Sequence, residues 1–173
     1  MTKALSNADL RLRPSISVII LNYNGLRWVE RCLESLQHQT VFPLIEIIVA
    51  DNQSTDGSDK MAAKLVENLP NAIFLQHGQN LGYCLGNNRA ASKAQADFLL
   101  FLNNDTWLEP DCLERLLSET KLSGAGASGP IILNYEDSSF QSMGAFGFDI
   151  FGLTSTRRVA AKTREVLMPE GCA

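Results

Sequence analysis

The chain has 173 residues, of which 45% are hydrophobic and 20% charged, as in ordinary globular domains with one sizeable core. Its net charge of −4 leaves no basic excess to neutralise phosphates, so we expect no nucleic-acid partner. No stretch reaches the roughly 18 apolar residues of a membrane-spanning helix. The four cysteines are widely spaced and form no C-x-x-C pair, which favours reduced thiols in a cytoplasmic protein over disulfides or a zinc site.

Residues 1–14 are interpreted as a polar leader, and residues 15–173 are expected to form one domain. In that domain, short apolar β-branched runs alternate with apolar residues at helical spacing. The runs predict strands at 16–21, 45–50, 72–76 and 98–102. The spacing predicts helices at 26–39, beginning at Leu26, at 57–68, at 83–95 and from Glu109-Pro110 onward. This alternation predicts an α/β fold with an open parallel sheet. Beyond Gly124 glycines and aromatics are frequent, and we expect short strands and loops there.

Polar side chains follow three of the predicted strands at their carboxyl ends. The first strand runs into Asn22-Tyr23-Asn24, the second into residues 51–54 and the fourth into Asn103-Asn104-Asp105. Ligands of open α/β sheets bind beyond this edge, and core packing does not require polar residues there. We therefore expect a ligand site at these three strand ends.

Asp51 and Asp105 are the carboxylates at these strand ends. Asp51 could accept a hydrogen bond from a base or a ribose; alternatively, it caps the next helix or organises a turn with Ser54. Asp105 could bind a hard cation such as Mg²⁺ or Mn²⁺ if a diphosphate supplied the remaining oxygen ligands. The alternative for Asp105 is a turn between strand and helix.

Three further features could serve a ligand at the same edge. Tyr23 could stack on a nucleobase, the alternative being an aromatic packed into its loop. Asn80-Leu81-Gly82 precedes a helix whose free N–H groups could face ligand phosphates. Asn88 and Arg89 in that helix add donors, although Arg89 fits a surface position equally well.

Other polar features are interpreted as structural. His38 and His77 have no paired ligand at helical or turn spacing, and the basic cluster from Arg157 to Arg164 is interpreted as solvated surface. Neither a P-loop, nor a dinucleotide-binding glycine motif, nor a G-x-S-x-G nucleophile turn is present in the sequence.

Four segments carry a family resemblance: residues 18–24, 47–58, 79–88 and 101–105. Their order and spacing resemble the inverting family 2 glycosyltransferases, especially the rhamnosyltransferase-like branch, over about residues 15–173. The resemblance implies a three-layer nucleotide-diphospho-sugar transferase (GT-A) fold, in which a mostly parallel sheet lies between helices.

The resemblance also implies a role for each matching residue. Tyr23 resembles the aromatic beside the nucleobase, and Asp51 the carboxylate that recognises the base. Asp105 matches the last position of the family's D-x-D motif, whose Mn²⁺ or Mg²⁺ bridges the donor phosphates. Asn103 stands where many members have the first Asp. The expected nucleotide contacts are Asn22, Tyr23, Asn24, Asp51, Asn80, Gly82, Asn88, Asn103 and Asn104, with Asp105 on the metal.

The implied activity is metal-assisted transfer, with inversion, of a hexose or deoxyhexose from a UDP- or dTDP-linked donor to a glycan or lipid-linked acceptor. It would serve cell-surface polysaccharide synthesis in the cytoplasm, and a peripheral position of the whole protein on the inner face of the membrane stays open. The family's catalytic base lies in a later acceptor-binding segment. We therefore expect the base beyond Ala173 and the domain to be truncated before it, with Asp149 and Glu170 as weaker substitutes.

Three alternatives to this activity remain. The chain could be a nucleotide-sugar-binding module without turnover, which a missing base would favour. It could be a sugar nucleotidyltransferase, although Asn22-Tyr23-Asn24-Gly25 supplies no basic, glycine-rich phosphate loop. It could also be a flavodoxin-like or receiver-type domain, whose metal binding would not depend on a nucleotide.

Overall fold

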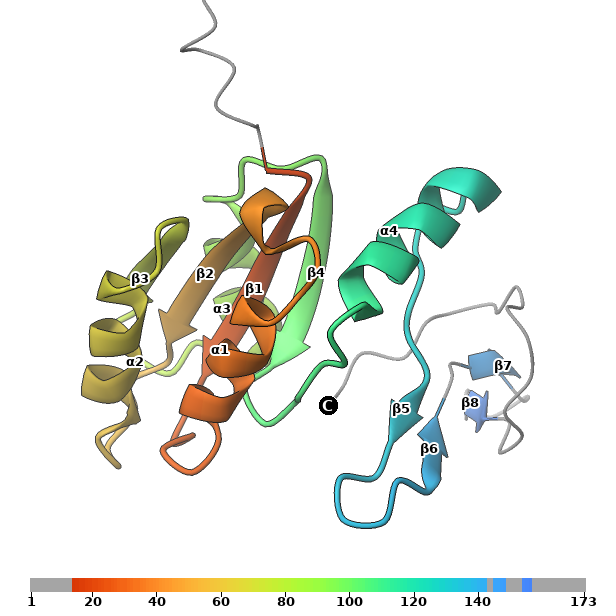
Figure 1. The fold of residues 1–173 in the computed structure, drawn as a ribbon. Helices are drawn as coiled ribbons and strands as arrows, with labels where there is room; N and C mark the ends of the chain where they lie inside the picture. The colour runs from red at the N-terminus through yellow and green to blue at the C-terminus, as the bar shows by residue number, and fades with distance from the viewer. Residues whose placement is uncertain (1–13, 143–144, 149–153, 157–173) are drawn as a thin grey trace, which may run out of the picture. The chain divides into compact units, whose positions relative to one another are not determined.

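The computed structural model describes residues 14–142, 145–148 and 154–156 (Figure 1). Expectations for the leader up to residue 13, for the basic cluster from Arg157 to Arg164, and for Asp149, Glu170 and Cys172 lie outside these residues. The chain divides into two compact units, Met1–Pro110 and Asp111–Ala173.

The first unit is built on a four-stranded sheet with the strand order β3-β2-β1-β4. The strands are β1 (Ile16–Asn22), β2 (Ile45–Asp51), β3 (Ala72–Gln76) and β4 (Phe98–Asn103). All three pairings between neighbours are parallel, so the predicted parallel sheet is confirmed. The two central strands, β1 and β2, are covered on both faces, which is why their sequences are near-continuous apolar runs.

Helices cover both faces of this sheet. In Figure 1, α1 (Val29–Gln37) and α2 (Ser58–Glu67) lie on one face and α3 (Gly82–Ala91) on the other. A short 3-10 helix, Phe42–Leu44, leads directly into β2. The first unit is therefore the three-layer α/β arrangement that the sequence predicts.

The core of the first unit is formed by the central strands and the helix faces turned toward them. Ile19, Ile48 and Ala50 of the sheet pack with Ala90 of α3. Burying one large aliphatic side chain of this kind stabilises the fold by about 1.5–3 kcal/mol. Helix α1 places a stripe of residues in the interior at helical spacing: Val29, Cys32, Leu33 and Leu36.

Helix α1 begins later than the predicted start at Leu26. The N–H groups of Trp28 and Val29 both donate to the carbonyl oxygen of Gly25, at 2.9 and 3.0 Å, so residues 26–28 form a turn. Leu26 is 41% exposed, and the predicted start of the helix at this residue is wrong.

Helix α3 ends at Ala91 rather than at Gln95, because the chain after it is bound to the sheet. The Gln95 N–H donates to the Glu46 carboxylate at 2.9 Å, and the Ala96 N–H donates to Ser17 Oγ at 3.2 Å. Ser17 Oγ in turn donates to the buried carboxylate of Glu46. These contacts at the amino ends of β1 and β2 end the helix.

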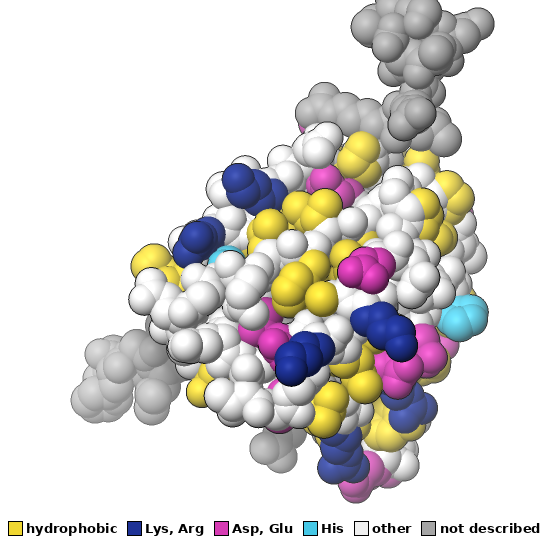
Figure 2. Space-filling model, turned by 90° about the vertical axis from the view of Figure 1, so that its left-hand side faces the viewer, with side chains coloured by type: hydrophobic (Ala, Val, Ile, Leu, Met, Phe, Trp, Pro, Cys, Tyr) yellow, Lys and Arg dark blue, Asp and Glu magenta, His cyan; other side chains and the backbone are white. Residues whose placement is uncertain are grey.

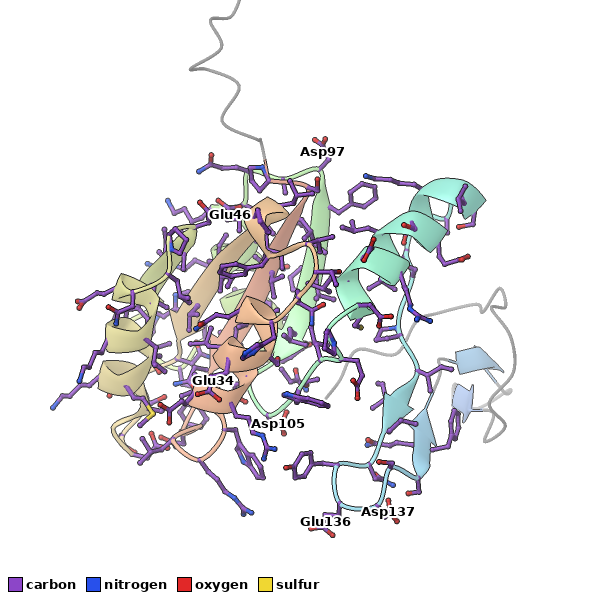
Figure 3. The ribbon with its side chains drawn as sticks, viewed as in Figure 1. Glu34, Glu46, Asp97, Asp105, Glu136 and Asp137 are labelled. Carbon is purple, nitrogen blue, oxygen red and sulfur yellow. The ribbon has the colours of Figure 1, made fainter. Side chains whose placement is uncertain are left out.

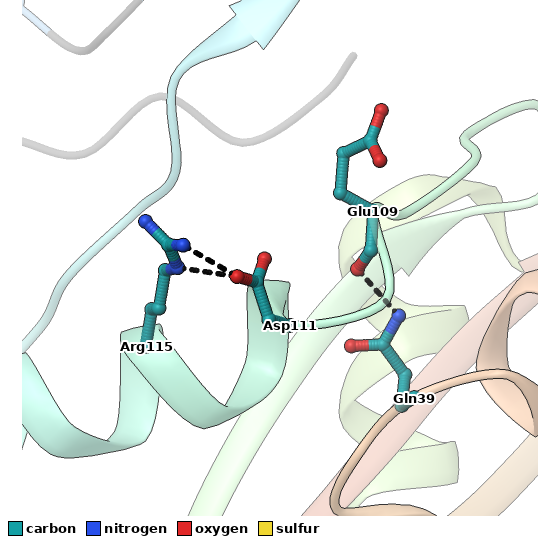
Figure 4. A network of polar contacts seen from close by, with 4 residues as sticks. All are labelled: Gln39, Glu109, Asp111 and Arg115. Atoms are coloured by element: carbon teal, nitrogen blue, oxygen red, sulfur yellow. Dashed lines mark hydrogen bonds and ion pairs between the residues drawn. The ribbon is translucent and has the colours of Figure 1, made fainter.

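The predicted helix at Glu109-Pro110 begins only at Cys112, as α4 (Cys112–Ser123). The Glu109 carbonyl accepts a hydrogen bond from Gln39 Nε2 at 2.7 Å (Figure 4), and the Pro110 carbonyl accepts one from the Thr40 N–H at 2.8 Å. Both carbonyls therefore bond to the segment after α1 instead of starting a helical ladder.

The second unit contains α4 and two antiparallel strand pairs. Gly124, in the left-handed region with φ of 65°, ends the helix. At its start, Arg115 Nε donates to Asp111 at 2.7 Å (Figure 4), an exposed pair of the kind that contributes little stability. The pairs are β5 (Ile132–Leu133) with β6 (Phe140–Ser142), and β7 (Ala145–Phe148) with β8 (Thr154–Thr156). Short strands beyond Gly124 are thus confirmed for the described residues.

The surface on the α2 and β3 side of the first unit carries charges of both signs. Figure 2 shows basic and acidic side chains interspersed with hydrophobic ones on this face, without a large area of one sign. In the described ranges, none of the helices combines the length and the apolar character needed to cross a membrane.

Candidate functional site

The carboxyl ends of β1, β2 and β4 meet at one edge of the sheet, where polar residues form a hydrogen-bonded cluster. The pairing aligns Asn22 with Asp51 and Leu21 with Asn103, so the three strands end at the same level. Asn22 and Asp51 are the last residues of their strands, one beyond each predicted end, and both are fully buried. The structure thus brings the three predicted strand ends together.

The carboxylate of Asp51 is held by four hydrogen bonds. Oδ1 accepts from Asn22 Nδ2 at 2.8 Å and from Ser54 Oγ at 2.6 Å. Oδ2 accepts from the Ser54 N–H at 2.9 Å and from Gln76 Nε2 at 3.1 Å. Burial by itself raises the pKa of Asp51, but these hydrogen bonds stabilise the anion and together hold the pKa below its ordinary value. Asp51 is therefore a buried anion that organises a turn with Ser54.

Asn22 connects Asp51 to the neighbouring loops. Its Nδ2 lies 2.8 Å from Asp51 Oδ1 and 2.9 Å from Ser58 Oγ. It also lies 3.2 Å from Ser54 Oγ, and because an amide has two N–H bonds it serves two of these acceptors at a time. Its Oδ1 accepts a hydrogen bond from Asn104 Nδ2 at 2.8 Å. Both polar atoms of Asn22 are thus engaged inside the protein.

The loops after β1 and β2 are joined into one surface. Asn24 Oδ1 accepts from the Thr55 N–H at 2.8 Å, and the Asn24 N–H donates to Ser54 Oγ at 2.9 Å. The Leu26 N–H donates to the Asp56 carboxylate at 2.9 Å. Asn24 has a φ of 52°, in the left-handed region that asparagine tolerates better than most residues. These bonds hold the two loops against each other.

The segment before α3 is bound to the same edge. Asn52 is buried, and its Nδ2 donates to Asn80 Oδ1 at 3.2 Å and to the Gly82 carbonyl at 3.3 Å. Asn80 Oδ1 also accepts from the Gly82 N–H at 2.8 Å. Gly82 has a φ of 69°, which favours glycine at the start of this helix. Asn88 lies exposed further along α3 and takes no part in the hydrogen bonds just described.

Asp105 is exposed just beyond the carboxyl end of β4. Figure 3 shows it at the arrowhead end of the strands, with Glu46 at the opposite end. The Asn103 carbonyl accepts from the Thr106 N–H at 3.2 Å and from Cys32 Sγ at 3.6 Å. Burial, and then the charge of Asp105, raise the pKa of Cys32 to about 12, so the thiol stays protonated and donates.

Two aromatic side chains are exposed in the loops of this edge. Tyr23 is 50% exposed, which leaves part of its ring open to a ligand. Trp107, two residues after Asp105, is 47% exposed and was not assigned a role from the sequence. A flat ligand can stack on an exposed ring of this kind.

The end of β4 carries side chains of the types that bind hard cations. The described part of the chain holds no group of three His, Cys, Asp or Glu side chains that could bind a metal by themselves. Mg²⁺ and Mn²⁺ take oxygen ligands from carboxylates, amides and substrate phosphates together. The carboxylate of Asp105 and the amide of Asn103, two residues apart in the chain, are of these ligand types.

Sequence reasoning did not assign a role to three members of the cluster: Asn52, Ser58 and Gln76. Gln76 is the last residue of β3, so the strand-end rule applied to the third strand would have found it. Ser58 is the first residue of α2, and its hydroxyl lies by Asn22 through a contact between residues far apart in the chain. That contact has no signal in a single sequence.

Residues 17–171 match the family described as Glycosyl transferase family 2. A curated relative is the N-acetylglucosaminyl-diphospho-decaprenol L-rhamnosyltransferase of Mycobacterium tuberculosis (strain ATCC 25618 / H37Rv). It is 30% identical over 139 residues, which cover 73% of this chain and 44% of the relative. The chain spans between 12% and 44% of the length of such curated relatives.

Solved structures show the same fold. TarS of S. aureus, residues 1–349 in complex with UDP, has 23% identity and a TM-score of 0.58, covering 71% of this chain and 40% of that one. The mannosyltransferase PcManGT from Pyrobaculum calidifontis, in complex with GDP-Man and Mn²⁺, has 21% identity and a TM-score of 0.59, covering 72% of this chain and 37% of that one. The predicted GT-A fold is therefore confirmed, and the match over nearly the whole sequence shows that the chain belongs to glycosyl transferase family 2.

Proposed function

We propose that the chain is the donor-binding part of an inverting glycosyltransferase. It would take a hexose or deoxyhexose from a UDP- or dTDP-linked donor for transfer to a glycan or lipid-linked acceptor. The observation that carries this proposal is the convergence of the polar ends of β1, β2 and β4 on one edge of the sheet, with Tyr23 and Asp105 exposed there. This is the edge at which open α/β sheets bind ligands.

The loops after β1 and β2 would form the base side of the site. Tyr23 would stack on the nucleobase, and Asn24 would supply polar contacts beside it. Asp51 would act on this side by holding the turn to Ser54, because its two carboxylate oxygens already accept four hydrogen bonds from the protein. A carboxylate has about four acceptor positions, so its capacity for further hydrogen bonds is small.

The segment before α3 and the end of β4 would receive the diphosphate. Helix α3 has ten residues and begins at Gly82, two residues after Asn80. Such a helix start favours negative charge because its free N–H groups and dipole point at the ligand. Asn88 and Asn103 are the remaining amides that we assign to this side.

Asp105, with the amide of Asn103, would hold Mn²⁺ or Mg²⁺ together with the donor phosphates. The complex of PcManGT with GDP-Man and Mn²⁺ supports the use of a divalent cation by this fold. A cation bound there supplies positive charge that stabilises the nucleoside diphosphate as it leaves. The task of this chain's own residues is to hold the two phosphates beside Asp105 and the base beside Tyr23.

We propose that the general base which takes the proton of the acceptor hydroxyl belongs to another part of the protein than residues 14–142. We also propose a cytoplasmic enzyme, peripheral to the membrane when its acceptor is lipid-linked. The cysteines support this compartment, because no disulfide joins Cys32, Cys84 or Cys112, the three in the described ranges.

The experiment that tests the proposed metal ligand is Asp105→Ala, with UDP affinity measured by calorimetric titration with and without Mn²⁺. We expect Mn²⁺ to strengthen UDP binding in the wild type and to have little effect in the variant. The matched control is Asp97→Ala, which removes an exposed carboxylate at the opposite end of the sheet (Figure 3). Both variants change the surface, so stability should stay within about 0.5 kcal/mol of the wild type. Full Mn²⁺ dependence in Asp105→Ala would contradict the assignment.

A further inference from the structure

A hydrogen bond between Asn104 and Asn22 fills the space beside Gly25. A Cβ atom on residue 25 would lie 2.0 Å from Asn104 Nδ2 and 2.5 Å from Asn22 Oδ1, which is closer than such atoms approach. The four described glycines with positive φ are Gly57, Gly78, Gly82 and Gly124, so Gly25 is not required by its backbone conformation. Glycine is required at this position because the hydrogen bond occupies the place of a side chain.

The side chain of Asn22, which accepts this hydrogen bond, is held in place by the surrounding protein. Its side chain has no exposed surface, and its Nδ2 donates into the group formed by Asp51 and Ser58. The hydrogen bonds made by Nδ2 hold the amide group in one orientation, and they therefore also fix the direction in which Oδ1 accepts. Asn22 is fully buried, and both polar atoms of its amide bond to other residues of the protein.

Asn104 links the loop after β4 to Asn22 by a side-chain hydrogen bond. Its half-buried side chain points to Asn22 Oδ1, while the next residue, Asp105, is exposed. The backbone of the loop is closed by the bond from the Thr106 N–H to the Asn103 carbonyl. The Asn22–Asn104 bond adds a side-chain link between this loop and the cluster that shapes the loops after β1 and β2.

We propose that Asn104 is a positioning residue for Asp105. Through its bond to Asn22 beside Gly25, it sets the Asp105 carboxylate at a fixed place relative to the loops around Tyr23 and Ser54. This inference rests on the proposed function, because it needs Asp105 to share a cation with the donor diphosphate. A nucleotide-sugar donor that contacts both Asp105 and these loops binds more tightly when the spacing between them is fixed before the donor binds.

The test uses the full 173-residue chain with the substitution Asn104→Ala. We expect the Mn²⁺-dependent gain in UDP affinity to fall by roughly 10-fold or more, as is typical when a group that orients a metal ligand is removed. UDP affinity without Mn²⁺ and the melting temperature should stay as in the wild type. The control is Asn68→Ala, which removes an exposed asparagine that bonds to the Lys64 carbonyl on α2.

Two further measurements separate positioning from direct contact. Amide hydrogen exchange at Asp105 and Thr106 in the metal-free protein should be faster in Asn104→Ala than in the wild type. Gly25→Ala should give the same loss of Mn²⁺-dependent affinity, because its new methyl group displaces the same hydrogen bond. The variant that combines Gly25→Ala with Asn104→Ala should lose no more of this affinity than Gly25→Ala alone, because both substitutions remove the same hydrogen bond.

Three results would overturn the inference. An equal loss of UDP affinity with and without Mn²⁺ in Asn104→Ala would make Asn104 a nucleotide contact. A full Mn²⁺ effect together with unchanged exchange in that variant would remove the positioning role and leave the proposed function standing. If the wild type itself shows no Mn²⁺-dependent gain, the proposed metal role falls, and this inference falls with it.

Discussion

Asp51 is charged although it is buried, and the reason lies in its four hydrogen-bond donors. Transfer of a carboxylate into the protein interior is costly unless its oxygens are bonded. Here both oxygens accept two hydrogen bonds each, from Asn22, Ser54 and Gln76. The anion in turn fixes the ends of β1, β2 and β3 and the turn to Ser54. The shape of the candidate site therefore depends on the ionised form of one residue.

We expect Asp51→Asn to lower the free energy of unfolding at pH 7 by about 1.5–3 kcal/mol, the contribution of a hydrogen bond to a charged group. The pKa of Asp51 in the folded protein is below the ordinary value of 3.8. Its stabilising contribution is therefore complete above 3.8 and is lost as the pH falls through the lower folded-state pKa. Urea denaturation of both proteins between pH 7 and about pH 3 measures this difference.

The control for that series is Glu67→Gln, which removes one exposed charge at the end of α2. It should show little difference from the wild type at any pH. A gap between Asp51→Asn and the wild type that stays constant down to pH 3 would contradict the charged state of Asp51.

At this scale the sequence predicts which residues come together but not what each one does. Asn22, Asp51 and Asn104 were expected at the ligand edge because each follows an apolar run. For Asp51 the sequence left two interpretations open, and the hydrogen bonds to Ser54 support the turn. The pairing of Asn22 with Ser58 could not be predicted, because it joins side chains from separate loops whose approach depends on the folded backbone.

Among the elements, the strands were predictable and the helix ends were not. Buried parallel strands need apolar β-branched runs, so the starts of β1, β2, β3 and β4 agree with the predicted starts. Helix ends depend on what the flanking backbone bonds to. The clearest case is α3, which stops at Ala91 because the next segment bonds to Glu46 and Ser17 at the amino edge of the sheet.

We expect Glu46→Ala to destabilise the protein because it leaves the buried hydroxyl of Ser17 and the part-buried N–H of Gln95 without this acceptor. Glu46 accepts from Ser17 Oγ and from the Gln95 N–H, and the residue is 8% exposed. Each buried group left without its partner costs about 1–3 kcal/mol. The loss should appear as a lower urea midpoint with an unchanged slope, measured by circular dichroism.

Glu46→Gln is the matched variant, because both hydrogen bonds end on Oε2 and an amide oxygen in its place can still accept them. It should lose less stability than Glu46→Ala. UDP binding in folded samples of both variants should equal that of the wild type, since Glu46 lies at the end of the sheet opposite to Asp105 (Figure 3). Stability of Glu46→Ala within 0.5 kcal/mol of the wild type would contradict the role of this cluster.

For the whole molecule, the alternation of strands and helices predicts the fold class, and the strand-end motifs predict the family. The strand order β3-β2-β1-β4 is not contained in that alternation, because hydrophobic periodicity does not say which strands are neighbours. The chain covers less than half of the curated relatives' length, so its acceptor and its catalytic base remain proposals. The single domain expected over residues 15–173 also remains a prediction; in the structure the first compact unit ends at Pro110 and the second begins at Asp111.

The most direct measurement is a thermal-shift panel of the chain with UDP, dTDP, GDP and CDP, each with and without Mn²⁺. A ligand at about 100 times its dissociation constant stabilises the folded state by roughly 2.7 kcal/mol, which raises the melting temperature by several degrees in a domain of this size. We expect a clear shift with UDP or dTDP that requires Mn²⁺. If none of the four diphosphates shifts the melting temperature with Mn²⁺ present, these strand ends do not form a donor site.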